Sequence, residues 1–311
     1  MSTLSTPAAA VPPRFQAEPR VPGAAAATGA WARVRRALPR RMPVLLSGLF
    51  VLLVIAIAVA APGLPLRSPT AQSVVRRLQP PSAEHLFGTD RLGRDILSRV
   101  VWGAQVSMAV AAAVVAISAL VGTLVGLVSG YFRGAASDLL VRVVDVLQAF
   151  PALILAMAIV TALGPGLANV VWGISIGLVP QFARVARAAT LAVREREYVE
   201  AARAAGATAR RVLLRHVLVN GVDPIIVLCT LLIPSAILTE AMLSFLGLGI
   251  TEPTPTWGNM INNGRLVLRE APWLTAFPSA AIVLTVIAFN LVGDAIRDAL
   301  DPRVQDVLVS R

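Results

Sequence analysis

Long apolar runs separated by short charged segments constrain this chain more than any other feature. The first run, VLLSGLFVLLVIAIAVAA at residues 44–61, contains no charged residue. About 20 apolar residues are enough for a helix to cross a bilayer. Further runs lie at 106–130, 139–163, 167–189, 221–249 and 277–296. We therefore expect an all-α integral membrane protein with six transmembrane helices, the fifth being interrupted by Pro234.

The composition supports the membrane class and argues against several other functions. Of the 311 residues, 56% are hydrophobic and only 14% are charged, which is too little charge to cover a soluble domain of this size. The net charge is +11, but the basic residues lie between apolar runs, so we predict no nucleic-acid binding. The single Cys229 excludes an internal disulfide, and the two His residues lie far apart, so we predict no metal site.

The distribution of Arg predicts the orientation in the membrane. All 28 basic residues are Arg. With both termini inside, the cytoplasmic segments carry 20 Arg and the outer segments carry 8. Basic loops resist translocation, so we expect the N- and C-termini in the cytoplasm of a multi-pass protein of the cell membrane. Residues 1–43 then form a disordered cytoplasmic tail, 62–105 an extracytoplasmic segment, 190–220 a cytoplasmic loop and 304–311 a short cytoplasmic tail.

The cytoplasmic loop contains an unusual stretch, EREYVEAARAAGATARRVLLRH, at residues 195–216. Ala201 and Ala202 favour a helix with almost no side-chain bulk, which suits close contact with another surface. Gly206 then predicts a turn with positive φ. A second helix follows, in which Arg210 and Arg211 precede apolar residues. A basic loop that only fixes orientation or touches lipid headgroups would explain the Arg but not the Ala and Gly, so we predict a docking element for a cytoplasmic partner.

The sequence Glu200-Ala201-Ala202, followed by Gly206, resembles the EAA loop of ATP-binding-cassette importer permeases. Residues 85–108, HLFGTDRLGRDILSRVVWGAQVSM, are similar to a signature of the second permease of dipeptide, oligopeptide and nickel importers. The segments 238–250, 253–261, 271–274 and 289–303 are similar to the same subgroup in the same order. The resemblance covers residues 44–303. Val219 stands where the family usually has Pro, which concerns the geometry of the loop, and Gln105 replaces a common basic residue.

The resemblance implies the type I importer permease fold with six transmembrane helices and a function in peptide import. It implies a second permease subunit, ATP-binding subunits that hold ATP and Mg, an extracytoplasmic substrate-binding protein and contact with membrane lipids. The 190–220 segment is then the coupling loop. A P-loop needs a Lys, and the chain has none, so we expect it to be no ATPase and to bind no cofactor itself. Import of nickel or another small solute, an ion-coupled secondary transporter and a membrane scaffold remain alternatives.

Other candidate residues lie in and beyond the apolar runs. Gly122, Gly126 and Gly130 repeat every four residues, a pattern typical of close helix packing. Glu240 is a polar residue within the fifth run, and either a structural hydrogen bond or a substrate contact fits it. The outer segments hold residues that fit either internal ion pairs and interfacial anchors or a docking platform for the binding protein: Asp90, Arg91, Arg94, Asp95 and Trp257.

Overall fold

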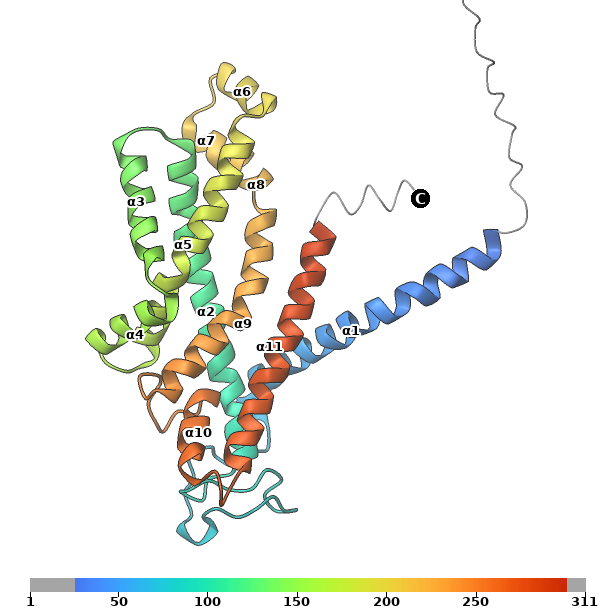
Figure 1. Cartoon of the computed structure of the whole chain (residues 1–311), viewed down its shortest axis with the longest axis vertical. Coiled ribbons are helices and arrows are strands. Elements are labelled where there is room, and N and C mark those ends of the chain that lie inside the picture. The colour runs from blue at the N-terminus through green and yellow to red at the C-terminus, as the bar shows by residue number, and fades with distance from the viewer. Residues whose placement is uncertain (1–25, 301–311) are drawn as a thin grey trace, which may run out of the picture. The chain divides into compact units, whose positions relative to one another are not determined.

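The computed structural model describes residues 26–300, and Figure 1 shows that the regular elements of this part are helices. The chain divides after Met42 into two units, Met1–Met42 and Pro43–Arg311. Helix α1 (Ala26–Ala60) begins within the predicted tail 1–43, so residues 26–43 are helical rather than disordered. The rest of that tail and the predicted tail 304–311 lie outside the described residues.

Two long helices form the centre of the second unit. Helices α2 (Ile96–Tyr131) and α5 (Leu167–Arg194) are in contact along much of their length. The main apolar core includes Val110 and Val114 of α2 and Ile174 and Phe182 of α5. Helix α2 begins at the end of the predicted outer segment, because Asp95 caps its first turn by accepting a hydrogen bond from the Ser98 amide.

The predicted third span, residues 139–163, is not one straight helix. Helix α3 (Ala135–Ala149) and helix α4 (Ala152–Leu163) meet at 93°. The break occurs at Phe150 and Pro151, because proline lacks the amide proton that a continuing helix needs and forces the residue before it into an extended conformation. Phe150 accordingly has ψ 137°. Together the two helices form a broken span or a re-entrant hairpin.

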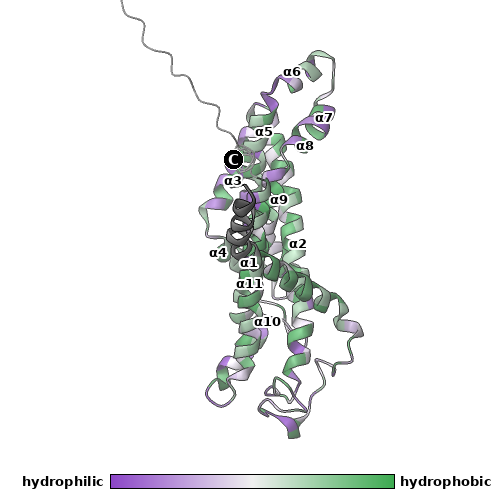
Figure 2. Ribbon diagram, turned by 90° about the vertical axis from the view of Figure 1, so that its right-hand side faces the viewer, coloured by the Kyte–Doolittle hydropathy of each residue, from purple (hydrophilic) through white to green (hydrophobic). Residues whose placement is uncertain are grey.

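The remaining helices complete the bundle. Helix α9 (Asp223–Phe245) continues through Pro234, so the proline does not end the helix as predicted. Helix α10 (Trp257–Gly264) is short and has a capping box at Thr256. Helix α11 (Trp273–Leu300) packs against α9 and α10. Figure 2 shows hydrophobic residues along the long helices and more hydrophilic residues toward their ends.

Four described helices are long and apolar enough to cross a membrane: part of α1, α2, α9 and α11, and the α3–α4 pair makes a fifth span if it counts as one. The six predicted spans are therefore not all recovered by length and hydropathy. Helix α5, which contains the predicted fourth span, carries Pro180 near its middle and Gln181 and three Arg residues in its second half. It is the central helix of the unit, and a helix covered by protein needs less hydropathy than one that faces lipid.

Candidate functional site

The coupling loop forms two short helices at the end of α5, joined as the sequence predicts at a glycine. Helix α6 (Glu197–Ala204) ends before Gly206, whose φ is +85°. Helix α7 (Ala209–Val212) begins after Thr208, whose hydroxyl oxygen accepts a hydrogen bond from the Arg211 amide at 3.4 Å. No atom lies within 4 Å of a Cβ built on Gly206, so its backbone conformation rather than its small size requires glycine.

The predicted coupling residues lie on the outer surface of this loop. Glu200, Ala201 and Gly206 are exposed, and Ala202 is half-buried. Arg210 and Arg211 are also exposed. Ala201 and Ala204 give part of the exposed surface of α6 little side-chain bulk, Tyr198 is exposed on the same helix, and basic side chains follow on α7. Such a surface leaves room for a close partner and presents positive charge beside the contact.

Apolar side chains on the inner side of the loop attach it to the helix bundle. Val199 of α6 and Val212 of α7 are fully buried, and with Val217 they form a small cluster around Leu127 of α2 and Val193 of α5. The cluster therefore packs α6 and α7 against the ends of α2 and α5. The two Val residues at 193 and 199, which flank the charged run 194–197, could have signalled this cluster.

Two Arg residues, which sequence reasoning did not select, connect the loop to the end of α2. Arg194 Nη1 donates a hydrogen bond to the carbonyl oxygen of Gly130 at 2.7 Å. The Arg203 guanidinium lies 5.0 Å from the centre of the Tyr131 ring, within the range of a cation–π contact. These contacts and the Val cluster hold the coupling loop against α2 from two sides.

After α7 the chain forms a π-helical turn (Leu213–Val217) and the short helix α8 (Leu218–Asn220). Val219, which stands where the family usually has Pro, is exposed within α8. Proline occurs a few residues later, at Pro224 in the first turn of α9, a position that favours the start of a helix. The helix start that follows the loop therefore has a proline in this chain too.

The three glycines of α2 face α5 at very short distance. A Cβ on Gly126 would lie 2.5 Å from the carbonyl oxygen of Ala183 and 2.6 Å from the Ala186 Cβ. Gly122 and Gly130 are similarly close to α5. Any side chain at these positions would push the two helices apart, so the backbones approach each other because the repeat has no side chains.

Glu240 lies inside the bundle with no exposed surface. Its carboxylate accepts hydrogen bonds from Ser244 at 2.7 Å and from Ser107 of α2 at 3.3 Å. A buried carboxyl group needs such partners. Of the two roles that the sequence left open, the geometry favours the structural hydrogen bond.

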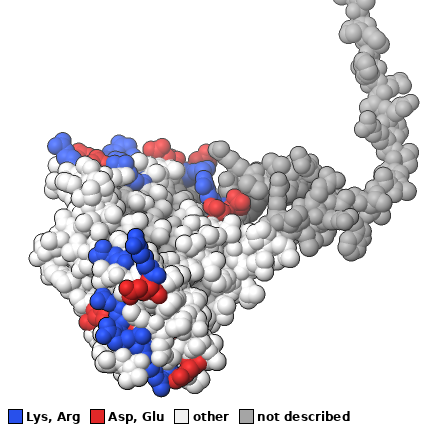
Figure 3. Space-filling view, turned by 60° about the horizontal axis from the view of Figure 1, so that its bottom comes forward, with Lys and Arg blue, Asp and Glu red and all other residues white. Residues whose placement is uncertain are grey.

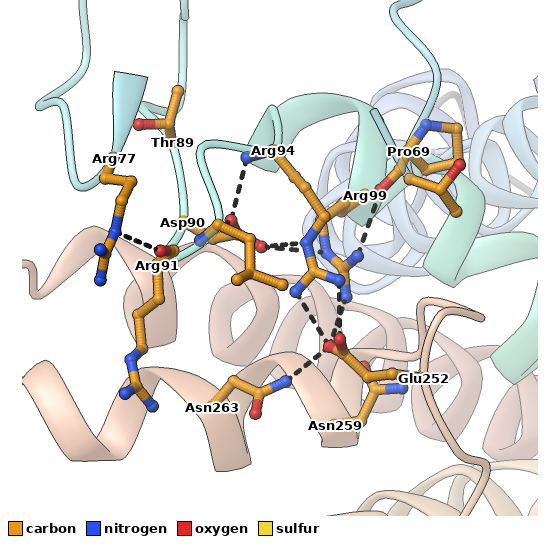
Figure 4. A network of polar contacts seen from close by, with 12 residues as sticks. Pro69, Arg77, Thr89, Asp90, Arg91, Arg94, Arg99, Glu252, Asn259 and Asn263 are labelled. Carbon is orange, nitrogen blue, oxygen red and sulfur yellow. Dashed lines mark hydrogen bonds and ion pairs between the residues drawn. The ribbon is translucent and has the colours of Figure 1, made fainter. Parts of the chain in front are cut away.

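At the other end of α2, the outer segments form a compact cap, which we define as residues 61–95 with the loop 246–256. A chain of ion pairs joins its two parts (Figure 4). Asp90 Oδ2 accepts a hydrogen bond from Arg94 Nε at 2.6 Å, and Arg94 donates two more to Glu252, at 2.7 and 3.0 Å. Arg99 Nη2 donates to Glu252 Oε1 at 3.2 Å. Residues 158 positions apart in the chain are thus fixed to each other.

Electrostatic effects in the ion-pair chain favour the charged forms of Arg94 and Glu252, whereas burial and the charge of Arg94 lower the pKa of Arg99. Burial disfavours the charged guanidinium of Arg94, but the hydrogen bonds and charges of Glu252 and Asp90 outweigh it, so the pKa of Arg94 is raised. Burial likewise opposes ionisation of Glu252, but Arg94 and Arg99 outweigh it and lower its pKa. The cap therefore remains ion-paired at neutral pH.

A second group of cap residues fixes the start of α2. His85 Nδ1 lies 2.8 Å from Asp95 Oδ2, and His85 Nε2 lies 3.0 Å from Arg67 Nη1. Because Arg only donates hydrogen bonds, we assign the proton of His85 to Nδ1, which donates to Asp95. The His85 side chain is buried, so its partners fix it inside the cap rather than presenting it to a ligand.

Most of the residues predicted to form a docking platform are buried or hydrogen-bonded within the protein. Asp90 and Arg94 are buried in the ion-pair chain, and Asp95 caps α2. Trp257 is only 2% exposed and donates a hydrogen bond from Nε1 to the carbonyl oxygen of Val100 at 3.0 Å, so it is a core residue and not an interfacial anchor. Arg91 is exposed, and its side chain points away from the cluster (Figure 4). Arg94 is buried because it pairs with both Asp90 and the distant Glu252.

The surface of the cap still carries charge. Figure 3 shows basic and acidic side chains next to one another on this face, surrounded by uncharged surface. Arg67 and Arg76 both contact Glu84, at 3.1 and 2.8 Å. Within residues 42–300, whose side chains are described, no group of three or more His, Cys, Asp or Glu is placed to hold a metal ion.

Comparison with known proteins adds independent information. Residues 122–306 match the model of the family described as binding-protein-dependent transport system inner membrane component. The matched region includes the coupling loop, the glycine repeat from Gly122 onward and helices α3 to α11.

Several relatives are similar over most of their length. A putative peptide transport system permease protein of Brucella suis is 43% identical over 87% of this chain and 91% of its own length. The probable D,D-dipeptide transport system permease protein DdpC of Escherichia coli is 43% identical over 83% of this chain and 86% of its own. The glutathione transport system permease protein GsiD of Pectobacterium atrosepticum is 43% identical over 88% and 92%.

A solved structure shares the fold. A chain of the inward-facing MetNI methionine ABC transporter superimposes with a TM-score of 0.55, over 66% of this chain and 98% of its own length. At 18% identity, this likeness concerns the arrangement of the helices and not the solute that is carried.

Proposed function

Because the chain belongs to the family of binding-protein-dependent transport system inner membrane components, and is a multi-pass permease of the cell membrane, we propose that it imports short peptides as half of the pathway of an ATP-driven importer. The observation that carries the peptide assignment is the set of relatives at 40–44% identity over 83–90% of the chain, whose names specify peptides, dipeptides or glutathione. Glutathione is itself a tripeptide, so the names agree on one chemical class.

The proposed mechanism separates ATP hydrolysis from transport. ATP-binding subunits hold ATP and Mg and close on each other, the outer side of α6 moves with them, and a second permease completes the pathway. The attachment of the loop supports this proposal, because Val199 and Arg203 join α6 to α2 and α5. The absence of Lys from the chain supports the location of the nucleotide site on another subunit.

The experiment is reconstitution of the chain with its second permease and ATP-binding subunits into liposomes. Uptake of a labelled dipeptide is measured with ATP inside and the substrate-binding protein outside, and uptake of nickel is measured in parallel. We expect dipeptide accumulation that requires both ATP and the binding protein. Accumulation of nickel without dipeptide would contradict the peptide assignment, and uptake that follows an ion gradient without ATP would contradict the importer mechanism.

A variant tests the docking role of α6. Ala201→Trp adds bulk to the exposed side of α6, and Ala136→Trp adds the same bulk to an exposed position on α3. We expect Ala201→Trp to lower dipeptide uptake by tenfold or more, as well as the amount of ATP-binding subunit that co-purifies, while Ala136→Trp retains both. Equal uptake by the two variants would contradict docking through α6.

A further inference from the structure

An ion pair between α3 and α5 is not explained by the coupling loop or by the cap. Arg184 Nη2 donates a hydrogen bond to Asp145 Oδ1 at 2.9 Å, and each of the two side chains is 54% exposed. At about 1.5 Å per residue, Asp145 lies about 15 Å along α3 from its start, and Arg184 lies about 15 Å along α5 from its end at Arg194. The pair therefore lies on an exposed face of α3 and α5, well away from the coupling-loop ends of both helices.

This position is unfavourable for a surface that faces lipid. A charged side chain near the middle of a bilayer costs about 3 kcal/mol even on insertion scales. Glu240 avoids this cost because it is fully buried and hydrogen-bonded, but Asp145 and Arg184 are exposed. Their exposed side must therefore face a polar medium, that is, a water-filled cavity or another polar surface.

The neighbouring residues extend the polar surface toward the coupling-loop end. Along α3, the exposed polar residues recur every three or four positions, which places them on one side of the helix. On α5, Arg187 follows Arg184 by three positions, and its Nε is buried without a hydrogen-bond partner. We call this surface the polar track, and its members are Asp138, Arg142, Asp145, Gln148, Arg184 and Arg187.

A pocket of about 210 Å³ opens within the polar track, between α3 and α5. Asp145, Arg184 and Arg187 line it. Sites for drug-sized ligands are about 300–1,000 Å³, so this pocket has the size for one end of a small molecule. Its lining offers one carboxylate acceptor and two guanidinium donors, one of which has an unsatisfied N–H.

We propose that the polar track lines the inner half of the translocation pathway, and that Asp145, Arg184 and Arg187 contact the charged termini of the passing peptide. A free peptide carries one ammonium and one carboxylate group. The ammonium replaces Arg184 at Asp145, while the guanidinium of Arg184 or Arg187 pairs with the carboxylate in the forked geometry that arginine favours. The exchange leaves Asp145 and both peptide termini paired, and one of the two guanidinium groups stays without an acidic partner, as Arg187, whose Nε has no hydrogen-bond partner, does before the peptide enters.

This proposal rests on the proposed function, and it distinguishes a peptide contact from a purely structural ion pair. Hydrogen bonds to charged groups contribute about 1.5–3 kcal/mol, which corresponds to about tenfold to hundredfold in a rate or affinity. A structural ion pair is restored when the two charges exchange positions. A peptide contact is not restored, because Arg187 and the rest of the track keep their original charges.

The experiment uses the whole importer in liposomes with four variants: Arg187→Gln, Arg184→Gln, the charge exchange Asp145→Arg with Arg184→Asp, and the control Arg133→Gln, which removes an exposed charge outside the track. Uptake of a labelled dipeptide and ATP hydrolysis stimulated by the loaded binding protein are measured for each. We expect at least about tenfold lower uptake for the first three, with stimulated ATP hydrolysis retained within about twofold, and uptake like wild type for Arg133→Gln.

The outcomes separate the two proposals. If the wild-type importer accumulates dipeptide and the charge exchange does so equally well, the ion pair is structural and the peptide contact is overturned. Loss of co-purifying second permease in the charge exchange would overturn it too, because the pair would then belong to the subunit interface. If the wild-type importer takes up no dipeptide at all, the proposed function itself fails, and the peptide contact falls with it.

Discussion

The cap and the coupling loop lie at opposite ends of α2, and they use the same residue type in opposite ways. In the cap, Arg94 and Arg99 are buried and paired with acidic residues from distant parts of the chain. In the coupling loop, Arg210 and Arg211 are exposed, and only apolar residues such as Val199 anchor the loop to the bundle. The cap is thus held together by charges, whereas the loop presents its charges outward.

The difference shows what each end can contribute to transport. Buried paired charges resist change, because separating one pair leaves a desolvated charge behind. Exposed charges are solvated and cost little to rearrange. The coupling loop therefore combines a small apolar attachment with a surface that is free to bind a partner, while the cap keeps α2 and the start of α10 in a fixed relation.

The largest expected effect comes from breaking the cap. Arg94→Ala leaves Asp90 and Glu252 without their main partner, and loss of one member of a buried ion pair costs about 3–5 kcal/mol. We expect a strongly lowered melting temperature in lipid nanodiscs, measured by tryptophan fluorescence. Arg91→Ala is the matched control, because Arg91 is three residues away and exposed. Equal melting temperatures for the two variants would show that the ion-pair chain does not hold the cap together.

Many of the helices that form the two ends of α2 and their surroundings could be predicted from the sequence. The apolar runs predicted the helices α2, α9 and α11, and the small residues around Gly206 predicted the two helices of the coupling loop and their turn. These features depend on local propensity and periodicity, which the sequence states directly. The family resemblance, which the match to residues 122–306 confirms, added the fold that connects them.

The ion pairs could not be predicted from the sequence. No sequence pattern singles out Glu252, yet it accepts hydrogen bonds from Arg94 and Arg99, more than 150 positions away. Likewise, Asp145 and Arg184 lie 39 positions apart and form a pair because α3 packs against α5. Partners of this kind depend on the tertiary fold. From the sequence alone, a charged residue that is buried in an ion pair cannot be distinguished from one that is exposed for docking.

A smaller effect is expected from the helix contact that connects the two ends. Gly126→Ala places a Cβ 2.5 Å from the Ala183 carbonyl oxygen, so α2 and α5 must separate, and overpacking of this kind costs about 1–3 kcal/mol. Gly48→Ala is the control, because nothing lies within 4 Å of a Cβ at Gly48. We expect a lower melting temperature for Gly126→Ala only. Tolerance of alanine at both positions would contradict the close α2–α5 contact.

The attachment of the coupling loop is expected to be weaker still. Val199→Ala removes two buried methyl groups, whose burial contributes about 1.6 kcal/mol to the stability of the loop. Because Val199 belongs to a small separate cluster, we expect faster hydrogen exchange in α6 and α7 and little change in global melting. Val219→Ala, at an exposed position of α8, is the control. Faster exchange that extends to the cap in Val199→Ala would show that the two ends do not unfold independently.

The smallest expected effect concerns the pH dependence of the cap. The ion pairs of Glu252 lower its pKa below the usual value of 4.5. Its contribution to stability is therefore complete above that value and is lost as the pH falls through the lowered pKa. Because the side chain is 37% exposed, solvent screens part of this contribution. We expect the difference in melting temperature between wild type and Glu252→Gln to be largest at neutral pH and to shrink as the medium is acidified below pH 4.5.

Glu84 is the matched control for this pH dependence. Arg67 and Arg76 lower its pKa as well, but its side chain is 56% exposed, and exposed ion pairs contribute little to stability. We expect Glu84→Gln to follow the wild-type melting profile at every pH. If Glu84→Gln lost as much stability at neutral pH as Glu252→Gln, exposure would not separate the two carboxylates, and the distinction between buried and solvated charges would fail within the cap itself.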